Sequence, residues 1–404
     1  MSIALRYGYR CKLRHRARLT MLSAAALLLA AGCDFGPAAS LHDPDRISSL
    51  DPVIDSVSPA GLALAGVDLV TIIGQNFSGD IAGNLVYFGQ SRGTILEASP
   101  TQMSVLPPNA PMQNLLLRVS VIGAENFSNG VTYSLDAAAA PFGSILSFED
   151  VFSITTDLAG HIYISLISDA RPVGIERLDA EGTRSRFAQS GFGWADMAFG
   201  PDGQLYTVRA VRAVFRFTEG SSQMTWVVIP DVTVKLSAVA VDASGVVWVA
   251  GDNAHIYSLS PDKSVQMHAF EANVRDLALA DDYLYAVGEQ QDRHAVWRFA
   301  RGAGAQLGPA EEILDIAGQG GRQGLSVAVA TSGHVYVGTD ATDPVILVDP
   351  DGTAEPLYPG ILTSPASKMA WGPSGYLYVV RDRSESLDPT ITRVNTRREG
   401  VRFF

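Results

Sequence analysis

Apolar and polar positions alternate in short runs from residue 144 to the C-terminus, and one such run recurs six times. The phrase "GPDGQLYTV" at residues 200–208 returns almost unchanged as "GPSGYLYVV" at residues 372–380. In each copy a turn position is followed, three residues later, by an aromatic residue. The turn positions are Gly160, Gly203, Gly245, Asp282, Gly333 and Gly375, and the aromatic residues are Tyr163, Tyr206, Trp248, Tyr285, Tyr336 and Tyr378. A spacing near 40 residues is typical of arrays of small sheets.

Each copy is predicted to be a four-stranded meander. The strand before the turn carries a small residue at its fourth position: Thr155, Ala198, Ala240, Ala278, Ala328 and Ala370. Small residues suit the crowded axis of a ring of sheets, and aromatic residues fill the wider space farther out. A third strand follows each turn, and a fourth is visible in "MTWVVI", "SVQMHAF" and "GVRFF". The fourth strand of the last copy is either the C-terminal "GVRFF" or, as an alternative, "SILSFE" at 144–149, which would pair with the last copy and close the ring.

These repeats resemble those of NHL-repeat and gluconolactonase-like propellers. The resemblance covers residues 144–404 and implies a six-bladed β-propeller. The fourth copy departs from the pattern, because Asp282 replaces the turn glycine and the Gly-rich stretch 301–324 lengthens its exit.

Residues 52–135 contain a second set of short β-branched and aromatic runs: "DLVTIIG", "NLVYFG", "QMSVLPP", "LLLRVSVIG" and "GVTYSL". Such runs between turn residues predict a small β-sandwich. The order of "PVIDSVSPAG", "VTIIGQNF", "VYFG" and "SNGVTYSL" resembles the immunoglobulin-like IPT/TIG domain, which implies a spacer or binding module without catalytic residues. Phe77 and Phe88 are expected in its core, and residues 136–143 are expected to be a linker. The predicted fold class is therefore all-β, an immunoglobulin-like sandwich followed by a six-bladed propeller.

The N-terminal segment has the pattern of an export signal. Six basic residues and no acidic residue lie in 1–18, and an apolar run of fourteen residues follows, too short to cross a bilayer core of roughly 30 Å. "LAAGC", residues 29–33, resembles the lipobox of bacterial lipoproteins. This implies that 1–32 is removed, that Cys33 is acylated, and that 33–51 is a flexible tether. The alternative is an ordinary signal with a chance cysteine.

Charge and cysteine content limit the partners and the location. Without residues 1–32, 24 basic residues face 42 acidic ones, a net charge of −18, which argues against binding to nucleic acid. Cys11 would leave with the signal, so the mature chain would hold one cysteine and no internal disulfide. We expect a location in the bacterial cell envelope, attached to a membrane by lipid and facing the periplasm or the cell surface.

Candidate site residues are the polar ones before or within the predicted inner strands, because propeller sites lie where the loops meet at the axis. They are Glu149, Asp150, Asp196, Asn273, Asp276, Arg322 and Lys368. The resemblance to calcium-dependent lactonases implies Ca²⁺ held by a Glu before the first strand and by later Asn and Asp residues. Glu149 stands in a comparable place. However, "WADMAF" and "ASKMAW" lack the Asn-bearing motif, and Asn273 is the substitute.

A propeller lyase with His and Glu near the axis is a further alternative, but His161 and His334 fall in hairpin turns. HExxH and CxxC are absent from the sequence. The sequence therefore assigns no catalytic residue and no metal ligand. The leading hypothesis is a lipid-anchored, non-enzymatic module that binds an envelope protein or polysaccharide through its propeller face. The alternatives are a calcium-dependent lactonase-like hydrolase, a lyase, or a structural role in envelope assembly.

Overall fold

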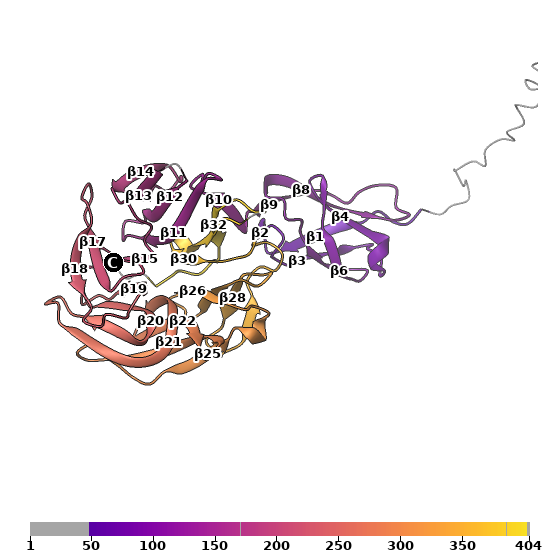
Figure 1. Ribbon diagram of the computed structural model, residues 1–404. Coiled ribbons are helices and arrows are strands. Elements are labelled where there is room, and N and C mark those ends of the chain that lie inside the picture. Colours follow the sequence, from indigo (N-terminus) through magenta and orange to yellow (C-terminus); the bar gives the residue numbers. More distant parts are fainter. Residues whose placement is uncertain (1–47, 170, 385, 402–404) are drawn as a thin grey trace, which may run out of the picture. The chain divides into compact units, whose positions relative to one another are not determined.

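The computed structural model describes residues 48–169, 171–384 and 386–401, and these residues form β-strands, turns and three short 3-10 segments (Figure 1). The 3-10 segments are Ile81–Gly83, Ala317–Gln319 and Pro373–Gly375. The proposed signal peptide, Cys33 and most of the proposed tether lie outside the described residues.

Two sheets form the N-terminal sandwich. One has the order β1-β3-β7-β6 and the other β2-β9-β8-β4-β5, in which β2 and β9 are parallel. The strands are β1 Val53–Ser58, β2 Leu62–Leu64, β3 Val70–Gln75, β4 Asn84–Phe88, β5 Ser91–Arg92, β6 Thr94–Ala98, β7 Gln102–Leu106, β8 Met112–Val121 and β9 Val131–Asp136. Phe77 and Phe88 are buried in one apolar cluster shared by both sheets, as expected. Asn76 adopts a positive φ of 62° in the turn after β3, a conformation that asparagine tolerates.

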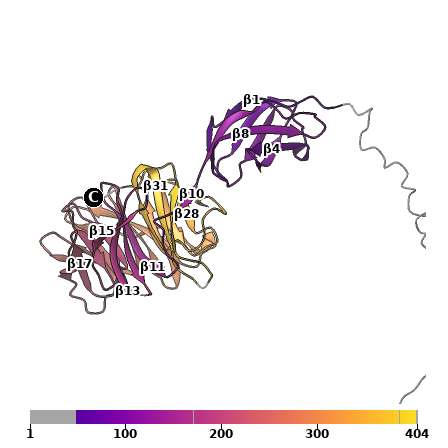
Figure 2. The ribbon, with the colours of Figure 1, turned by 90° about the horizontal axis from the view of Figure 1, so that it is seen from above.

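Six sheet modules, here called blades one to six, make up the propeller (Figures 1 and 2). Blade one holds β11 Glu149–Thr156, β12 Ile162–Ser168, β13 Arg171–Leu178 and β14 Arg184–Ala188, and blade two holds β15 Asp196–Phe199, β16 Leu205–Val208, β17 Ala213–Phe217 and β18 Met224–Val228. Blades three and four are built from β19 Leu236–Val241, β20 Val247–Leu259, β21 Val265–Ala280, β22 Tyr283–Gln290, β23 Arg293–Gly302, β24 Gln306–Leu307 and β25 Glu311–Asp315. Blade five holds β26 Gly324–Val329, β27 Val335–Thr339, β28 Val345–Val348 and β29 Ala354–Pro356, and blade six holds β30 Lys368–Trp371, β31 Tyr376–Arg381, β32 Thr390–Asn395 and β10 Ala139–Phe142.

The two residue rows of the repeat lie as predicted. Each aromatic residue pairs across the hairpin with the small residue of the inner strand, for example Tyr163 with Thr155 and Trp248 with Ala240. All six aromatic residues are buried between strands, with exposed fractions of 0–6%. All six small residues line the cavity on the propeller axis. The small side chains thus let the inner strands approach one another, and the aromatic side chains fill the outer layer.

The strand that closes the ring differs from both candidates in the sequence. Ala139–Phe142, within the expected linker 136–143, pairs with β32 as the outer strand of blade six. Residues 399–401 instead follow the inner strand of blade five, where the Val401 amide donates to the Val329 carbonyl at 3.0 Å. "SILSFE" leads into β11 of blade one. The linker composition concealed a strand because its alanines carry little β propensity.

Blades three and four share one continuous sheet. The strand β21 pairs with β20 through its first half and with β22 through its second half. It is therefore the outer strand of blade three and the inner strand of blade four. In the hairpin between β21 and β22, where Asp282 replaces the turn glycine, the residue with a positive φ is Asp281, at 45°. The number of modules remains six.

Candidate functional site

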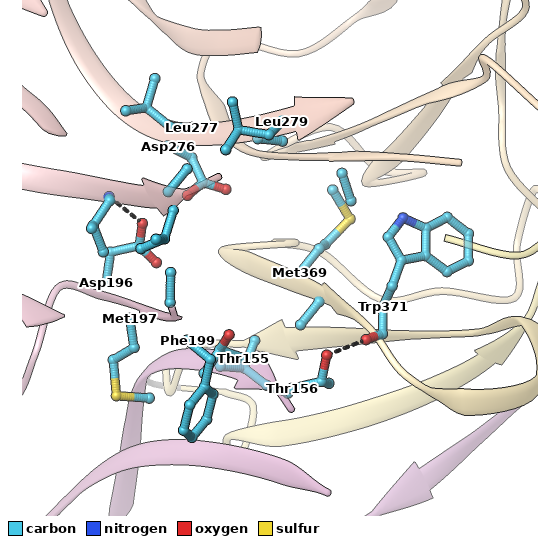
Figure 3. Close-up of a pocket in the computed structure, with 18 of the residues that line it drawn as sticks. Thr155, Thr156, Asp196, Met197, Phe199, Asp276, Leu277, Leu279, Met369 and Trp371 are labelled. Atoms are coloured by element: carbon cyan, nitrogen blue, oxygen red, sulfur yellow. Dashed lines mark hydrogen bonds between the residues drawn. The ribbon is translucent and has the colours of Figure 1, made fainter. Parts of the chain in front are cut away.

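The six inner strands surround a cavity of about 140 Å³ on the propeller axis (Figure 3). Most of its lining residues are apolar. Asp196 and Asp276 lie at the end where the inner strands begin, and Asp157 directly follows the first inner strand, β11. The polarity of this end depends on one position of the inner strand, the one that lies two residues before the small residue of the repeat. Its occupants, in blades one to six, are Ser153, Asp196, Ala238, Asp276, Ser326 and Lys368.

Three of these residues form an ionic cluster, here called the axial cluster: Asp196, Asp276 and Lys368. The Lys368 Nζ lies 3.0 Å from the Asp276 Oδ1 and 3.7 Å from the Asp196 Oδ1. It also donates to the Arg275 carbonyl at 3.3 Å. The three residues come from blades two, four and six, so a bond between them crosses the ring.

The second oxygen of each carboxylate is bonded to the next blade. The Val239 amide donates to the Asp196 Oδ2 at 2.7 Å, a bond marked in Figure 3, and the Val327 amide donates to the Asp276 Oδ2 at 3.0 Å. Inner strands are edge strands, so their axis-facing amides need acceptors from outside the sheet. The carboxylates of Asp196 and Asp276 supply two of these acceptors and thereby join neighbouring blades.

The two serines at the same position also connect blades. The Ser153 hydroxyl donates to the Trp194 carbonyl at 2.8 Å, and the Ser326 hydroxyl donates to the Ala366 carbonyl at 3.0 Å. Four of the six equivalent side chains therefore bind the backbone of the next blade, either within its inner strand or just before that strand begins. This recurrence indicates that the position serves ring assembly.

Burial and charge act in opposite directions on the axial cluster. Burial raises the pKa of Asp196 well above its ordinary value, and the Lys368 charge offsets part of that rise. Burial by itself would lower the pKa of Lys368, but the charges of Asp196 and Asp276 overcome it and raise that pKa. Lys368, with 12% of its side chain exposed, is therefore a protonated ammonium and a poor nucleophile.

The other four candidates do not join this cluster. Glu149 forms a two-pronged ion pair with Arg184 of the outer strand of blade one, at 2.7 and 2.8 Å. Asp150 pairs with Arg383 at 2.8 Å. Asn273 is exposed on β21, and Arg322 is 90% exposed beside Asp340. Of the seven candidates, the structure therefore brings Asp196, Asp276 and Lys368 together and leaves the other four with separate partners or exposed.

The residues around the axis do not fit Ca²⁺, which needs six to eight oxygen ligands. The Lys368 ammonium stands between the carboxylates of Asp196 and Asp276, where a cation would have to bind. Burial would raise the pKa of Glu149, but its hydrogen bond with Arg184 lowers it overall, so this carboxylate is committed to a local ion pair. Within the described ranges no three His, Cys, Asp or Glu side chains are grouped as a metal site.

Neither histidine of the lyase alternative lines the axial cavity, although Asp157, the partner of His161, does. The His161 Nδ1 is 2.9 Å from the Asp157 carboxylate, and His334 lies 3.2 Å from Asp349, both in or beside hairpin turns. No described histidine lines the axial cavity.

Sequence reasoning missed a group of exposed aromatic residues on blades one and two. Phe148, Phe152 and Phe192 are 46%, 44% and 41% exposed, and they are the exposed phenylalanines among the described residues of the propeller. A signal for Phe152 was available, because it stands at an inner-strand position where the other blades have Ala195, Ser237, Arg275, Leu325 and Ser367. Phe148 and Phe192 lie in loops, where no repeat pattern marks them.

Comparison with known proteins agrees with this architecture. Residues 52–135 match the IPT/TIG domain family, so the sandwich is an IPT/TIG domain. The comparison with curated protein sequences gave no match. In the described part of the chain, no helix has the length and apolar character needed to cross a membrane.

Several solved structures share the fold. A putative phosphatase from Bacteroides thetaiotaomicron is 12% identical, with a TM-score of 0.56 and coverage of 88% of this chain and 99% of its own. An auxiliary nutrient binding protein from the same organism is 11% identical, with a TM-score of 0.51 and coverage of 87% and 98%. A gluconolactonase from Xanthomonas campestris is 16% identical, with a TM-score of 0.50 and coverage of 64% and 89%. At these identities the likeness is one of fold.

Proposed function

We propose that this protein is a cell-envelope binding protein, anchored through an acylated Cys33, whose propeller presents a rigid face to a partner and performs no chemistry. The IPT/TIG domain would hold the propeller at a distance from the membrane. The propeller face would then meet an envelope protein or polysaccharide.

The axial cluster is the observation that carries this proposal. A catalytic axis needs acids or bases that can hold a metal ion or exchange protons with a substrate. Here Asp196 and Asp276 each have one oxygen facing Lys368 and the other bonded to a neighbouring blade. The third carboxylate of the cavity, Asp157, is bonded to His161 and Tyr163. This arrangement supports a structural role for the axis and leaves the loops for recognition.

The location rests on two observations. The basic and apolar pattern of residues 1–32 followed by Cys33 favours export and acylation. A protein of the same fold is described as an auxiliary nutrient binding protein, and we propose a comparable binding role in the envelope for this chain.

Fractionation of cells tests the anchor. The wild-type chain should sediment with membranes, and Cys33→Ser should be found in the soluble envelope fraction, because acylation needs the thiol. Cys11→Ser is the matched control and should behave as the wild type. Membrane association of Cys33→Ser equal to that of the wild type would contradict lipid anchoring.

Thermal unfolding with Ca²⁺ tests the hydrolase alternative. A cation bound to the native state raises the melting temperature in proportion to the logarithm of its concentration above Kd. We expect no such rise for the wild-type chain at millimolar Ca²⁺. A rise that Asp276→Asn abolishes would replace the binding role with the calcium-dependent one.

A further inference from the structure

We propose that a hollow between blades one and two binds a polysaccharide chain, with the Phe192 ring as the stacking platform for one sugar unit. This inference deepens the proposed function and rests on it, because it assigns a site and a chemical class to the binding role. The hollow, here called the blade-1/2 hollow, has a volume of about 490 Å³ and is lined by Arg186, Gln189, Ser190, Gly191, Phe192, Ser222 and Gln223.

The Phe192 ring is exposed on a rigid support. The Ser190 hydroxyl accepts hydrogen bonds from the Phe192 amide at 3.1 Å and from the Trp194 indole at 3.0 Å. Trp194 is fully buried against Phe215 and Phe217, so it fixes the loop in the core. A ring held in this way loses little conformational entropy when a ligand binds.

One face of the Phe192 ring remains available. The Arg209 guanidinium lies over the ring with its Cζ 4.1 Å from the ring centroid. The side chain is nevertheless 41% exposed, and Phe192 borders the hollow. The guanidinium therefore supports one face, and the opposite face can stack against an apolar surface.

The polar lining is free to bind. Arg186, Gln189, Ser222 and Gln223 are exposed, and their side chains form no hydrogen bond or ion pair with any residue that the structure describes. Carboxamides and hydroxyls both donate and accept hydrogen bonds, as the hydroxyls of a sugar do. Arg186 is the one charged residue of the lining, and no carboxylate is present.

This combination identifies the class of ligand. A pyranose offers a face of C–H groups to an aromatic ring and a rim of hydroxyls to amide side chains. A metabolite would need an enclosed pocket, whereas the blade-1/2 hollow is an open depression at the surface that a longer chain can cross. The near absence of charge in the lining fits a polyhydroxylated chain better than a charged peptide.

Affinity electrophoresis of the mature, detergent-solubilised protein tests the inference, with xylan, mixed-linkage β-glucan, polygalacturonate and chitosan as separate probes in the gel. We expect at least one polysaccharide to retard the wild-type protein. Phe192→Ala should weaken that binding by about tenfold or more, because the stacking platform is lost. Phe148→Ala is the matched control, since Phe148 is equally exposed but does not border the hollow, and it should bind as the wild type.

A second variant fills the hollow without removing a contact. A Cβ at Gly191 would meet no atom within 4 Å, and Gly191 does not have a left-handed backbone, so Gly191→Leu should fold normally. We expect it to abolish retardation while its melting temperature stays at the wild-type value. Binding by Gly191→Leu or Phe192→Ala at wild-type strength, or retardation by none of the four probes, would overturn the inference.

The outcome is separable from that of the proposed function. If envelope extracts contain a protein that binds the wild-type chain and Phe192→Ala alike, while no polysaccharide binds, then the sugar site is wrong and the binding role stands. If polysaccharide retards the protein but Cys33→Ser remains membrane-bound, then the sugar site stands and the lipid anchor is wrong.

Discussion

Lys368 holds together two carboxylates that would otherwise repel each other in a site where water has little access. Because Asp196 and Asp276 also accept hydrogen bonds from backbone amides of neighbouring blades, the cluster connects blades across the axis. A buried charge that loses its partner is costly, whereas the intact cluster contributes little net stability. Two substitutions separate these effects.

Lys368→Met should destabilise the protein by about 3–5 kcal/mol at pH 8, because it leaves two carboxylates buried without a counter-charge. The loss should be smaller at pH 5, where a carboxylate can take up a proton. Urea unfolding followed by tryptophan fluorescence measures both values. Lys235→Met, at an exposed lysine, is the control and should change stability by less than about 0.5 kcal/mol. Equal losses at the two pH values would contradict this account.

Asp196→Asn should flatten the pH dependence of stability. Burial raises the pKa of Asp196 from 3.8 to about 7, so the folded chain binds this proton more tightly than the unfolded chain. Its contribution to stability is therefore fully present below the unfolded pKa and is lost as the pH rises toward 7. Between pH 4.5 and 7 the wild type should lose roughly 1–3 kcal/mol more than the variant.

The control for this measurement is Asp169→Asn. The hydrogen bond with Arg383 lowers the pKa of Asp169, so this carboxylate is ionised in the folded chain throughout the window. Its substitution should leave the slope of stability against pH unchanged between pH 4.5 and 7. A wild-type slope that Asp196→Asn fails to reduce would contradict the raised pKa.

At the scale of the elements, the ring is closed by β10, a strand of four residues far in sequence from the blade it completes. It pairs with β32 on one side, and Phe142 anchors it in the core with a ring centroid 4.8 Å from that of Tyr378. Pro141 is tolerated because β10 is an edge strand, where one row of amides needs no partner. The closure therefore depends on one buried side chain as well as on the ladder.

Phe142→Ala should destabilise the propeller by about 3–5 kcal/mol, the usual cost of truncating a buried phenylalanine. The neighbouring residue Pro141 is exposed, and Pro141→Ala should have little effect. Thermal unfolding of the two variants beside the wild type gives the comparison. Similar melting temperatures for Phe142→Ala and Pro141→Ala would show that the Phe142 side chain contributes little to the stability of the closed ring.

At the scale of the whole molecule, charge restricts the choice of partner. If residues 1–32 are removed, the net charge is −18, which repels phosphate backbones and anionic surfaces. Attachment to a membrane would then have to come from acyl chains rather than from basic patches. The same charge does not oppose an uncharged polysaccharide.

The mature protein should not bind duplex DNA, because it lacks the excess of basic residues that displaces counterions from phosphates. An electrophoretic mobility shift assay at about 0.15 M salt, with a basic DNA-binding protein as the positive control, measures this. A shifted band that disappears as salt is raised would show a basic surface that the net charge conceals.

Much of the fold could be predicted from the chain because the signal was repeated six times. The aromatic and small rows follow from strand alternation and from the wedge shape of a blade, and both physical causes act locally. The closing strand could not be predicted, since Ala139–Phe142 has weak β propensity and its partner lies about 250 residues away. Closure is decided by which segment reaches the open edge of blade six.

The candidate site, like the fold, was determined in part by the sequence and in part by the tertiary structure. The sequence by itself determined that Asp196, Asp276 and Lys368 occupy one equivalent position in three blades, because the repeat aligns them. Only the tertiary structure decided that these three side chains meet across the axis. It also decided that Glu149 forms an ion pair with Arg184 and that Phe192 is exposed beside the blade-1/2 hollow. Periodicity sets the side of a strand on which a residue lies, but the partner of a charge and the exposure of a loop depend on the closing of the ring.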